Sequence, residues 1–315
     1  MEITVFTPTY NRSNTLERVY KSLLAQTNQD FVWLIIDDGS TDNTKELVDK
    51  WIAEDNLKIE YHYKVNGGKH TAMRLAYQLT KTKYLLAIDS DDELTRDAVE
   101  AFLNEWKEIE KSGLENQYAE VSGLTYSNEG KLIGNFAFPS GDKFIDSNWH
   151  EMVLKFQNNN EHVVCWNLKK LRECVHIPEE FWLSDKVNFF GEGALWARIG
   201  RKYKTRYINK KLRIYYYDGG DSLMRIHDKT QGHYNNLVGN MYFLDENLDY
   251  FFWNPKYFIH LILKFIISGK ELNFSSITLL KQMNTSRFRL YYSLHYPIGL
   301  GLWFYYKKIR KQFWF

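Results

Sequence analysis

The residues with the clearest chemical potential form the run Asp89-Ser90-Asp91-Asp92, directly after the apolar segment 84–88. Closely spaced carboxylates repel one another unless a cation neutralises them. Oxygen ligands on a loop suit Mg²⁺ or Mn²⁺, which typically keep bound waters and accept substrate phosphates. The run therefore predicts a divalent-cation site; the alternative is a solvated loop that caps the next helix.

Three further polar clusters follow other apolar segments of the first hundred residues, at Thr7 to Arg12, Asp37 to Asp42 and Lys64 to His70. Asp38 can accept a hydrogen bond from a ring N–H such as that of uracil, and Tyr10 offers an aromatic face to a base. Lys69 could stand beside a phosphate. The preceding Gly67-Gly68 is more simply a turn, because it does not match the phosphate-binding loop G-x-x-x-x-G-K-[ST].

Apolar periodicity predicts alternating strands and helices around these clusters. Strands are expected at 3–6, 31–36, 59–63 and 84–88, with amphipathic helices between them and after the fourth. This alternation predicts right-handed crossovers and a mostly parallel sheet. Ligands bind beyond the carboxyl ends of the strands in such sheets. The four clusters should therefore lie on one rim and form one site.

Beyond residue 115 the pattern is looser. We expect a strand pair at 121–126 and 131–138, helical stretches near 149–156 and 193–202, and a strand at 212–217. Eight cations lie between Arg198 and Arg213. They form either a solvated face or a surface for the phosphate of a lipid-linked acceptor.

The composition narrows the class of protein. The 315 residues are 44% hydrophobic and 25% charged, which excludes intrinsic disorder and a polytopic membrane protein. Two cysteines cannot form a disulfide framework or a four-thiolate zinc site. The N-terminus shows no basic segment followed by a long apolar one, so we expect a cytoplasmic, reducing location.

The last 66 residues differ from the rest. Residues 250–315 hold ten Lys/Arg, a single acid, Glu271, and 19 aromatics, whereas the whole chain has a net charge of only +2. Residues 290–306 are apolar but contain His295, Pro297 and two glycines, so we expect an interfacial segment at the inner face of the cell membrane rather than a span. The alternative is a helical region packed on the catalytic core or on a second subunit of a homo-oligomer. No nucleic-acid-binding motif is present.

Taken together and in order, the four clusters resemble the family 2 glycosyltransferases with the GT-A fold. The motifs that carry the resemblance are Val5 to Arg12, Ile36 to Thr44, Asn66 to Lys69 and Asp89 to Asp92. The resemblance is close over 1–110 and looser over 111–225.

The resemblance implies an α/β fold, Rossmann-like, with a mostly parallel sheet and alternating helices. The catalytic domain would span 1–225, with a nucleotide-sugar half at 1–110 and an acceptor half at 111–225, followed by a helical region at 226–315. It also implies transfer of a sugar from a nucleotide sugar, UDP-linked, to a saccharide or lipid-linked acceptor. The reaction would invert the anomeric carbon and serve the synthesis of a cell-surface polysaccharide.

The resemblance also assigns roles by position. The residues implied to bind the nucleotide sugar all lie in the four clusters and are Pro8, Thr9, Tyr10, Asp38, Gly68, Lys69, Asp89 and Ser90. Asp91 would coordinate the Mn²⁺ or Mg²⁺ that bridges the diphosphate, with Asp89 as a further ligand.

Two positions depart from the family pattern. Relatives often have Glu-Asp at the start of a later helix, where this chain has Glu192 followed by Gly193. We expect Glu192 to be the general base, with Asp185 as second choice. Many relatives have a histidine near Asp218; here Asp218 itself or His227 would complete the metal site. A nucleotidyltransferase and a non-catalytic carbohydrate-binding protein remain alternatives.

Overall fold

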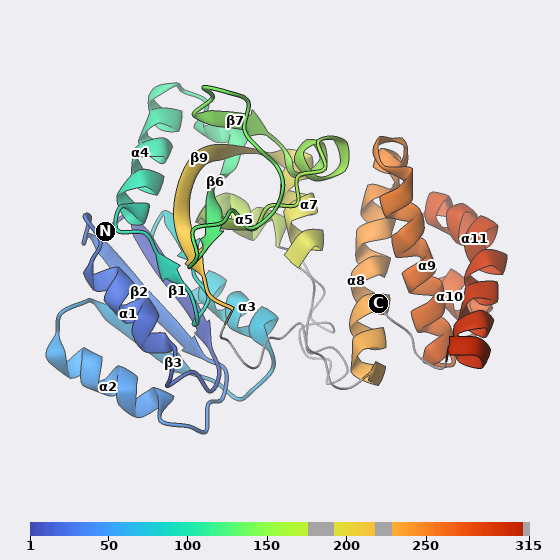
Figure 1. Cartoon of the computed structure of the whole chain (residues 1–315), viewed down its shortest axis with the longest axis horizontal. Helices are drawn as coiled ribbons and strands as arrows, with labels where there is room; N and C mark the ends of the chain where they lie inside the picture. The colour runs from blue at the N-terminus through green and yellow to red at the C-terminus, as the bar shows by residue number, and fades with distance from the viewer. Residues whose placement is uncertain (176–191, 218–228, 311–315) are drawn as a thin grey trace. The chain divides into compact units, whose positions relative to one another are not determined.

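The structure is a computed structural model that describes residues 1–175, 192–217 and 229–310 (Figure 1). These residues form two compact units. The first contains the described residues of Met1–Pro178 and Ile199–Ser222, and the second those of Glu179–Arg198 and Leu223–Phe315.

The first unit is built on one mixed sheet. Its strands are β1 (Ile3–Thr9), β2 (Phe31–Asp37), β3 (Ile59–Tyr63), β4 (Tyr84–Ala87), β5 (Glu93–Leu94), β6 (Tyr118–Ser127), β7 (Phe144–Ser147), β8 (His162–Asn167) and β9 (Lys204–Tyr215). Their order is β3-β2-β1-β4-β8-β6-β9-β5, with β7 paired to β9. The first four strands run parallel to one another, as the sequence predicts, whereas β8 is antiparallel to both of its neighbours.

Helices connect the strands of this unit. They are α1 (Leu16–Leu24), α2 (Thr44–Glu54), α3 (Lys69–Leu79), α4 (Ala98–Lys111) and α5 (Leu168–Cys174), with shorter turns at Glu115–Gln117 and Glu151–Lys155; α7 (Glu192–Lys202) begins in the second unit and ends in the first. Every residue of β2 is buried, as expected for a parallel strand covered on both faces. The α/β architecture predicted from the sequence is confirmed.

One predicted strand is wrong. Residues 131–138 form no strand. They make an isolated bridge between Tyr126 and Leu132, and backbone hydrogen bonds join Ser127 to Lys131 (2.7 Å) and Ile133 to Thr125 (3.0 Å). The neighbours of β6 in the sheet are β8 and β9, which are distant in sequence. Long-range pairing therefore supplies the sheet neighbours of β6, and the local hairpin that the apolar pattern suggested is limited to one short turn.

The second unit is helical, as predicted. It contains α8 (Lys229–Asn247), α9 (Pro255–Glu271), α10 (Ser276–Gln282) and α11 (Ser286–Tyr305), with shorter turns at Leu248–Trp253 and Tyr306–Arg310. Glycines allow close packing between these helices. A Cβ on Gly269 would lie 2.5 Å from Leu279, and one on Gly299 would lie 2.7 Å from Ile266. None of the described helices is long and apolar enough to cross a membrane.

An aromatic stack joins the first two helices to the sheet. The Trp51 ring on α2 lies 4.3 Å from the Tyr20 ring on α1 and 5.8 Å from the Trp33 ring on β2, measured between centroids. The indole N–H of Trp33 donates to the Thr7 hydroxyl on β1 (3.0 Å). This stack fixes α1 and α2 beside the strands whose ends carry the polar clusters.

Replacing Trp51 by alanine should therefore destabilise the first unit. We expect a loss of about 3–5 kcal/mol in the free energy of unfolding, because a buried aromatic side chain is deleted from a packed core. Ile52→Ala is the matched control, since Ile52 is the next residue of α2 and is 42% exposed. Urea unfolding followed by far-UV circular dichroism measures both; equal midpoints for the two variants would contradict this description of the core.

Candidate functional site

The parallel pairing brings the four polar clusters to one edge of the sheet. Thr9 at the end of β1 lies opposite Asp37 of β2, and Asp37 lies opposite Tyr63 of β3. On the other side of β1, Phe6 pairs with Ala87 of β4, so the loop that starts at residue 88 leaves from the same edge. The predicted common rim is therefore present in the structure.

The loops after β1 and β2 are tied together by side chains. Asn11 adopts a left-handed conformation (φ 51°), and its side-chain oxygen accepts a hydrogen bond from the Thr41 N–H (2.8 Å). The Asp42 carboxylate accepts from the Ser13 N–H (3.0 Å) and from the Thr44 hydroxyl (2.6 Å). These bonds hold the two loops, and hence Tyr10 and Asp38, in a fixed relation.

Asp38 organises the loop after β3. Its buried carboxylate accepts hydrogen bonds from the backbone N–H of Gly67 (3.0 Å) and Gly68 (2.7 Å), and from the Lys64 ammonium group. Gly68 has φ +90°, and Gly39 beside Asp38 has φ +88° with no room for a Cβ against Asn66. An ionised carboxylate has about four acceptor positions. Three of these positions are used by the donors named above, and binding of a base by Asp38 stays a prediction.

The predicted base-binding residues differ in exposure. Tyr10 is 47% exposed and Pro8 is partly exposed, so both offer surface to a ligand. Thr9 is buried, and its carbonyl accepts the Asp38 N–H (2.8 Å). Ser90 is buried as well. The assignment of Thr9 and Ser90 to ligand binding stays a prediction, and any contact they make would have to involve the backbone or a local rearrangement.

Asp89 lies between two cations. The Lys69 ammonium group is 2.8 Å from one carboxylate oxygen, and an Arg213 guanidinium nitrogen is 3.3 Å from the other. Burial opposes ionisation, but the charges of Lys69 and Arg213 outweigh it and lower the pKa of Asp89 to about 2. Asp89 is therefore ionised throughout the neutral range. Lys69 lies beside the acidic run, as a residue near a phosphate would.

Asp91 has the opposite electrostatic character. Burial and the negative charge of Asp89 raise its pKa, although Arg12 partly opposes this. A divalent cation would relieve the repulsion between these two carboxylates. Their oxygen donors also suit Mn²⁺ or Mg²⁺. The residues present therefore fit such a metal, with substrate phosphates and water as the remaining ligands.

Asp92 and Arg213 form a buried ion pair that the sequence did not reveal. Arg213 on β9 donates from Nε to one Asp92 oxygen (2.6 Å), and the Tyr216 N–H donates to the other (3.2 Å). Asp92 is fully buried and the Arg213 side chain is 11% exposed. Burial raises the pKa of Asp92 to about 7 despite Arg213, and the charges of Asp89 and Asp91 add to the shift. Arg213 is thus the main cation that neutralises the acidic run.

The expected roles of the cations at 198–213 need correction. Arg213 is neither solvated nor available to an acceptor phosphate, because it is buried between Asp89 and Asp92. Arg206 pairs with Asp146 (2.9 Å), and Arg198 pairs with Glu246 (2.5 Å). The sequence did contain an indication that Arg213 is buried, because it lies between the apolar residues Leu212 and Ile214 of a predicted strand. Treating it as one of eight similar cations obscured this difference.

Several predicted site residues cannot be placed. Asp185, Asp218 and His227 lie outside the described residues, as does the side chain of Glu192, whose backbone is the first residue of α7. Within the described part of the chain, no group of three or more His, Cys, Asp or Glu side chains is arranged to hold a metal ion. The base and any third protein ligand stay predictions.

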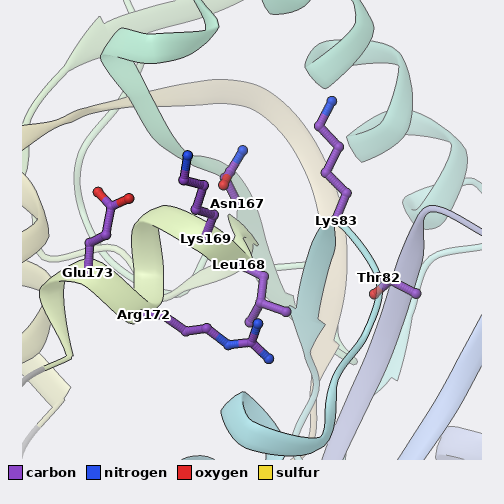
Figure 2. Close-up of a pocket in the computed structure, with 7 residues that line it drawn as sticks. All are labelled: Thr82, Lys83, Asn167, Leu168, Lys169, Arg172 and Glu173. Atoms are coloured by element: carbon purple, nitrogen blue, oxygen red, sulfur yellow. The ribbon is translucent and has the colours of Figure 1, made fainter.

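A pocket of about 540 Å³ lies away from this edge of the sheet (Figure 2). Its lining includes Thr82 and Lys83, which precede β4, together with Asn167 and residues along α5. The Lys83 ammonium group is paired with Glu110 (2.5 Å), and Arg172 donates to the carbonyls of Tyr77 and Thr80 (both 2.7 Å). These polar groups support the packing of α3, α4 and α5, and they converge on no common point.

The N-terminal part of the chain matches a protein-family model. The matched family is glycosyl transferase family 2, over residues 4–133, which include all four loops described above but not Arg213.

Curated relatives agree with this match. The chain is 30% identical to "Glycosyltransferase GlyG" of Streptococcus pneumoniae over 43% of this chain and 42% of that protein. It is 38% identical to a chondroitin synthase of Pasteurella multocida over 33% of this chain and 11% of that protein. It is 28% identical to "GalNAc(5)-diNAcBac-PP-undecaprenol beta-1,3-glucosyltransferase" of Campylobacter jejuni, over 68% and 64%. The chain spans less than half the length of the first curated relatives it matches.

Solved structures share the fold. S. aureus TarS (residues 1–349) in complex with UDP-GlcNAc matches with a TM-score of 0.60 at 13% identity, over 100% of this chain and 93% of that one. GalNAc-T7 with UDP, GalNAc and Mn²⁺ matches with a TM-score of 0.57 at 13% identity, over 98% and 57%. These similarities confirm the predicted GT-A fold. Residues 4–133 carry the match to glycosyl transferase family 2, and the solved structures share the fold over nearly the whole chain.

Proposed function

We propose that this protein is an inverting, metal-dependent glycosyltransferase. It would move a sugar from a nucleotide sugar, UDP-linked, to the hydroxyl of a saccharide or lipid-linked acceptor. Residues 1–225 would form the catalytic domain. A role in cell-surface polysaccharide synthesis is consistent with the names of the Pasteurella and Campylobacter relatives. Work on a lipid-linked acceptor would take place at the inner face of a membrane.

The observation that carries the proposal is the charge arrangement after β4. Asp89 is held ionised by Lys69 and Arg213, while Asp91 has a raised pKa and lies beside the Asp89 charge. Such a pair favours a divalent cation and a diphosphate that shares it. The same edge of the sheet presents an exposed tyrosine and the Asp38 carboxylate. Base, diphosphate and cation therefore each have complementary groups on one rim.

Each residue would have a defined task. Pro8 and Tyr10 would contact the base and ribose, and Asp38 would accept the N3–H of uracil in addition to its present donors. Lys69 would exchange its contact with Asp89 for a phosphate oxygen. A cation held by Asp91 and Asp89 would supply stabilisation of the negative charge on the departing nucleoside diphosphate. Glu192, with Asp185 as second choice, would remove the proton of the acceptor hydroxyl.

Asp91→Asn should abolish metal-dependent binding of UDP. The substitution preserves shape but removes the charge that the cation requires. Calorimetry with UDP, with and without Mn²⁺, is the measurement, and Asp97→Asn is the matched control because Asp97 pairs with Lys210 at a half-exposed position. Unchanged Mn²⁺-dependent affinity in Asp91→Asn would refute the metal assignment. Release of pyrophosphate from UTP and a sugar 1-phosphate, with no release of UDP from a nucleotide sugar, would show nucleotidyl transfer instead.

Arg213→Met should destabilise the first unit by about 3–5 kcal/mol, because buried Asp92 loses its cation and must either stay charged or take up a proton. The double variant Arg213→Met/Asp92→Asn should recover part of this loss, since the remaining carboxamide carries no charge. Lys210→Met is the control on the same strand. Urea unfolding gives the free energies, and a double variant no more stable than Arg213→Met would show that the ion pair is not the cause.

Glu192→Gln should lose turnover but keep donor binding, since only the proton acceptor is removed. Transfer rates with a panel of acceptors and UDP-sugar titration separate the two effects. Should Glu192→Gln turn over normally, the base would lie elsewhere, and Asp185→Asn is the next variant to measure.

A further inference from the structure

The exposed face of α11 is apolar over almost its whole length. Its large apolar side chains are between 44% and 63% exposed and are Leu290, Leu294, Ile298, Phe304 and Tyr305. Positions 290, 294 and 298 are four residues apart, so they lie on one side of the helix. Pro297 and Gly301 on the same side are also exposed, as is Ser293, whose hydroxyl donates to the Arg289 carbonyl (2.8 Å). From 290 to 306 the sequence contains no Asp, Glu, Lys or Arg.

The opposite face of α11 is occupied by the helical unit itself. Phe288, Tyr292 and Gly299 are buried there, and Gly299 lies close against Ile266 of α9. The Phe265 ring of α9 lies 5.2 Å from the Phe288 ring. His295, which is partly exposed, donates from Nδ1 to the Tyr291 carbonyl (2.8 Å). One side of α11 is thus packed against the helical unit, and the other side is exposed to solvent.

Positive charge borders this face, and the Asp245 carboxylate at the N-terminal end of α11 accepts from the Asn284 and Thr285 N–H groups (3.1 and 3.0 Å). Arg287 precedes the face, and the exposed Lys307 and Lys308 follow it. The Lys307 ammonium group lies over the Trp303 ring (4.7 Å from its centroid). Glu271 is the single acid in residues 250–315, and its carboxylate accepts the Trp303 indole N–H (2.5 Å). Aromatic residues beside lysines are typical of the membrane–water interface.

We propose that the exposed face of α11 lies in the surface of a membrane that contains anionic lipids. The apolar side chains would enter the region between headgroups and acyl chains, and the flanking cations would bind lipid phosphates. No described helix, α11 included, is both long and apolar enough to cross a membrane. A second copy of the chain is a poorer occupant, because residues 250–315 carry nine more positive than negative charges in each copy.

This inference does not depend on the chemistry at the sheet edge. It would place the proposed transferase at a membrane surface. It is tested on the full chain by co-sedimentation with vesicles of phosphatidylcholine alone or mixed with phosphatidylglycerol. We expect binding to the anionic vesicles only, weakened by high salt. Leu294→Glu/Ile298→Glu should weaken vesicle binding about tenfold or more, because the two apolar side chains that would leave water on binding are replaced by charged ones.

Two further variants make the test specific. Lys307→Gln/Lys308→Gln should weaken binding about tenfold at low salt while leaving the apolar face intact. Leu24→Glu/Ile52→Glu adds the same charges at exposed positions of the first unit and should bind like the unaltered chain. Thermal unfolding of each variant shows whether it is folded.

Equal binding to both kinds of vesicle, or unchanged binding of both α11-face and lysine variants, would overturn the inference. So would a dimer in solution that Leu294→Glu/Ile298→Glu dissociates, with no vesicle binding, because the occupant would then be a second copy. UDP titration of the same samples separates the proposals, since a chain that binds vesicles but not UDP contradicts the proposed function alone.

Discussion

The charge balance after β4 is the constraint on which the site depends. Three of the four residues 89–92 are acidic, and they leave a buried strand at nearly the same point. Their repulsion would oppose folding if nothing compensated it. The compensation comes from Arg213 on β9 and from Lys69 at the start of α3. Arg213 contacts both Asp89 and Asp92, whereas burial and the negative charge of Asp89 raise the pKa of Asp91.

The two cations that contact residues 89–92 come from distant parts of the first unit, so several elements are needed to build this short loop. Arg213 can reach Asp92 because β9 runs beside β5, where Arg213 pairs with Leu94. Lys69 can reach Asp89 because Asp38 binds the N–H groups of Gly67 and Gly68 and so fixes the start of α3. The site is therefore assembled from four parallel strands and one strand that comes from much later in the chain.

The sequence predicted the local part of this structure well. The four parallel strands and their helices follow from apolar periodicity, and the common rim follows from parallel pairing. The insertion of β8 beside β4 and the absence of a strand at 131–138 depend on long-range pairing that no local pattern encodes. The burial of Arg213 could not be predicted for the same reason, because its partner Asp92 is distant in the sequence and a cation without a known partner is expected to face solvent. Asp38 was expected to face a ligand, yet much of its hydrogen bonding is structural.

The two units carry different kinds of surface. The first presents charged and polar loops suited to a nucleotide sugar, and the second presents an apolar helix face bordered by cations. Such a division would suit an enzyme that draws its donor from water and meets its acceptor at a lipid surface.

The most direct test of the account is a crystal structure of the protein with UDP and Mn²⁺. We expect Mn²⁺ bound to the Asp91 carboxylate and to both phosphates, with the Arg213–Asp92 ion pair intact and Tyr10 against the uracil. Nucleotide bound at another place, or Mn²⁺ bound without Asp91, would contradict the central claim that this acidic run holds the diphosphate.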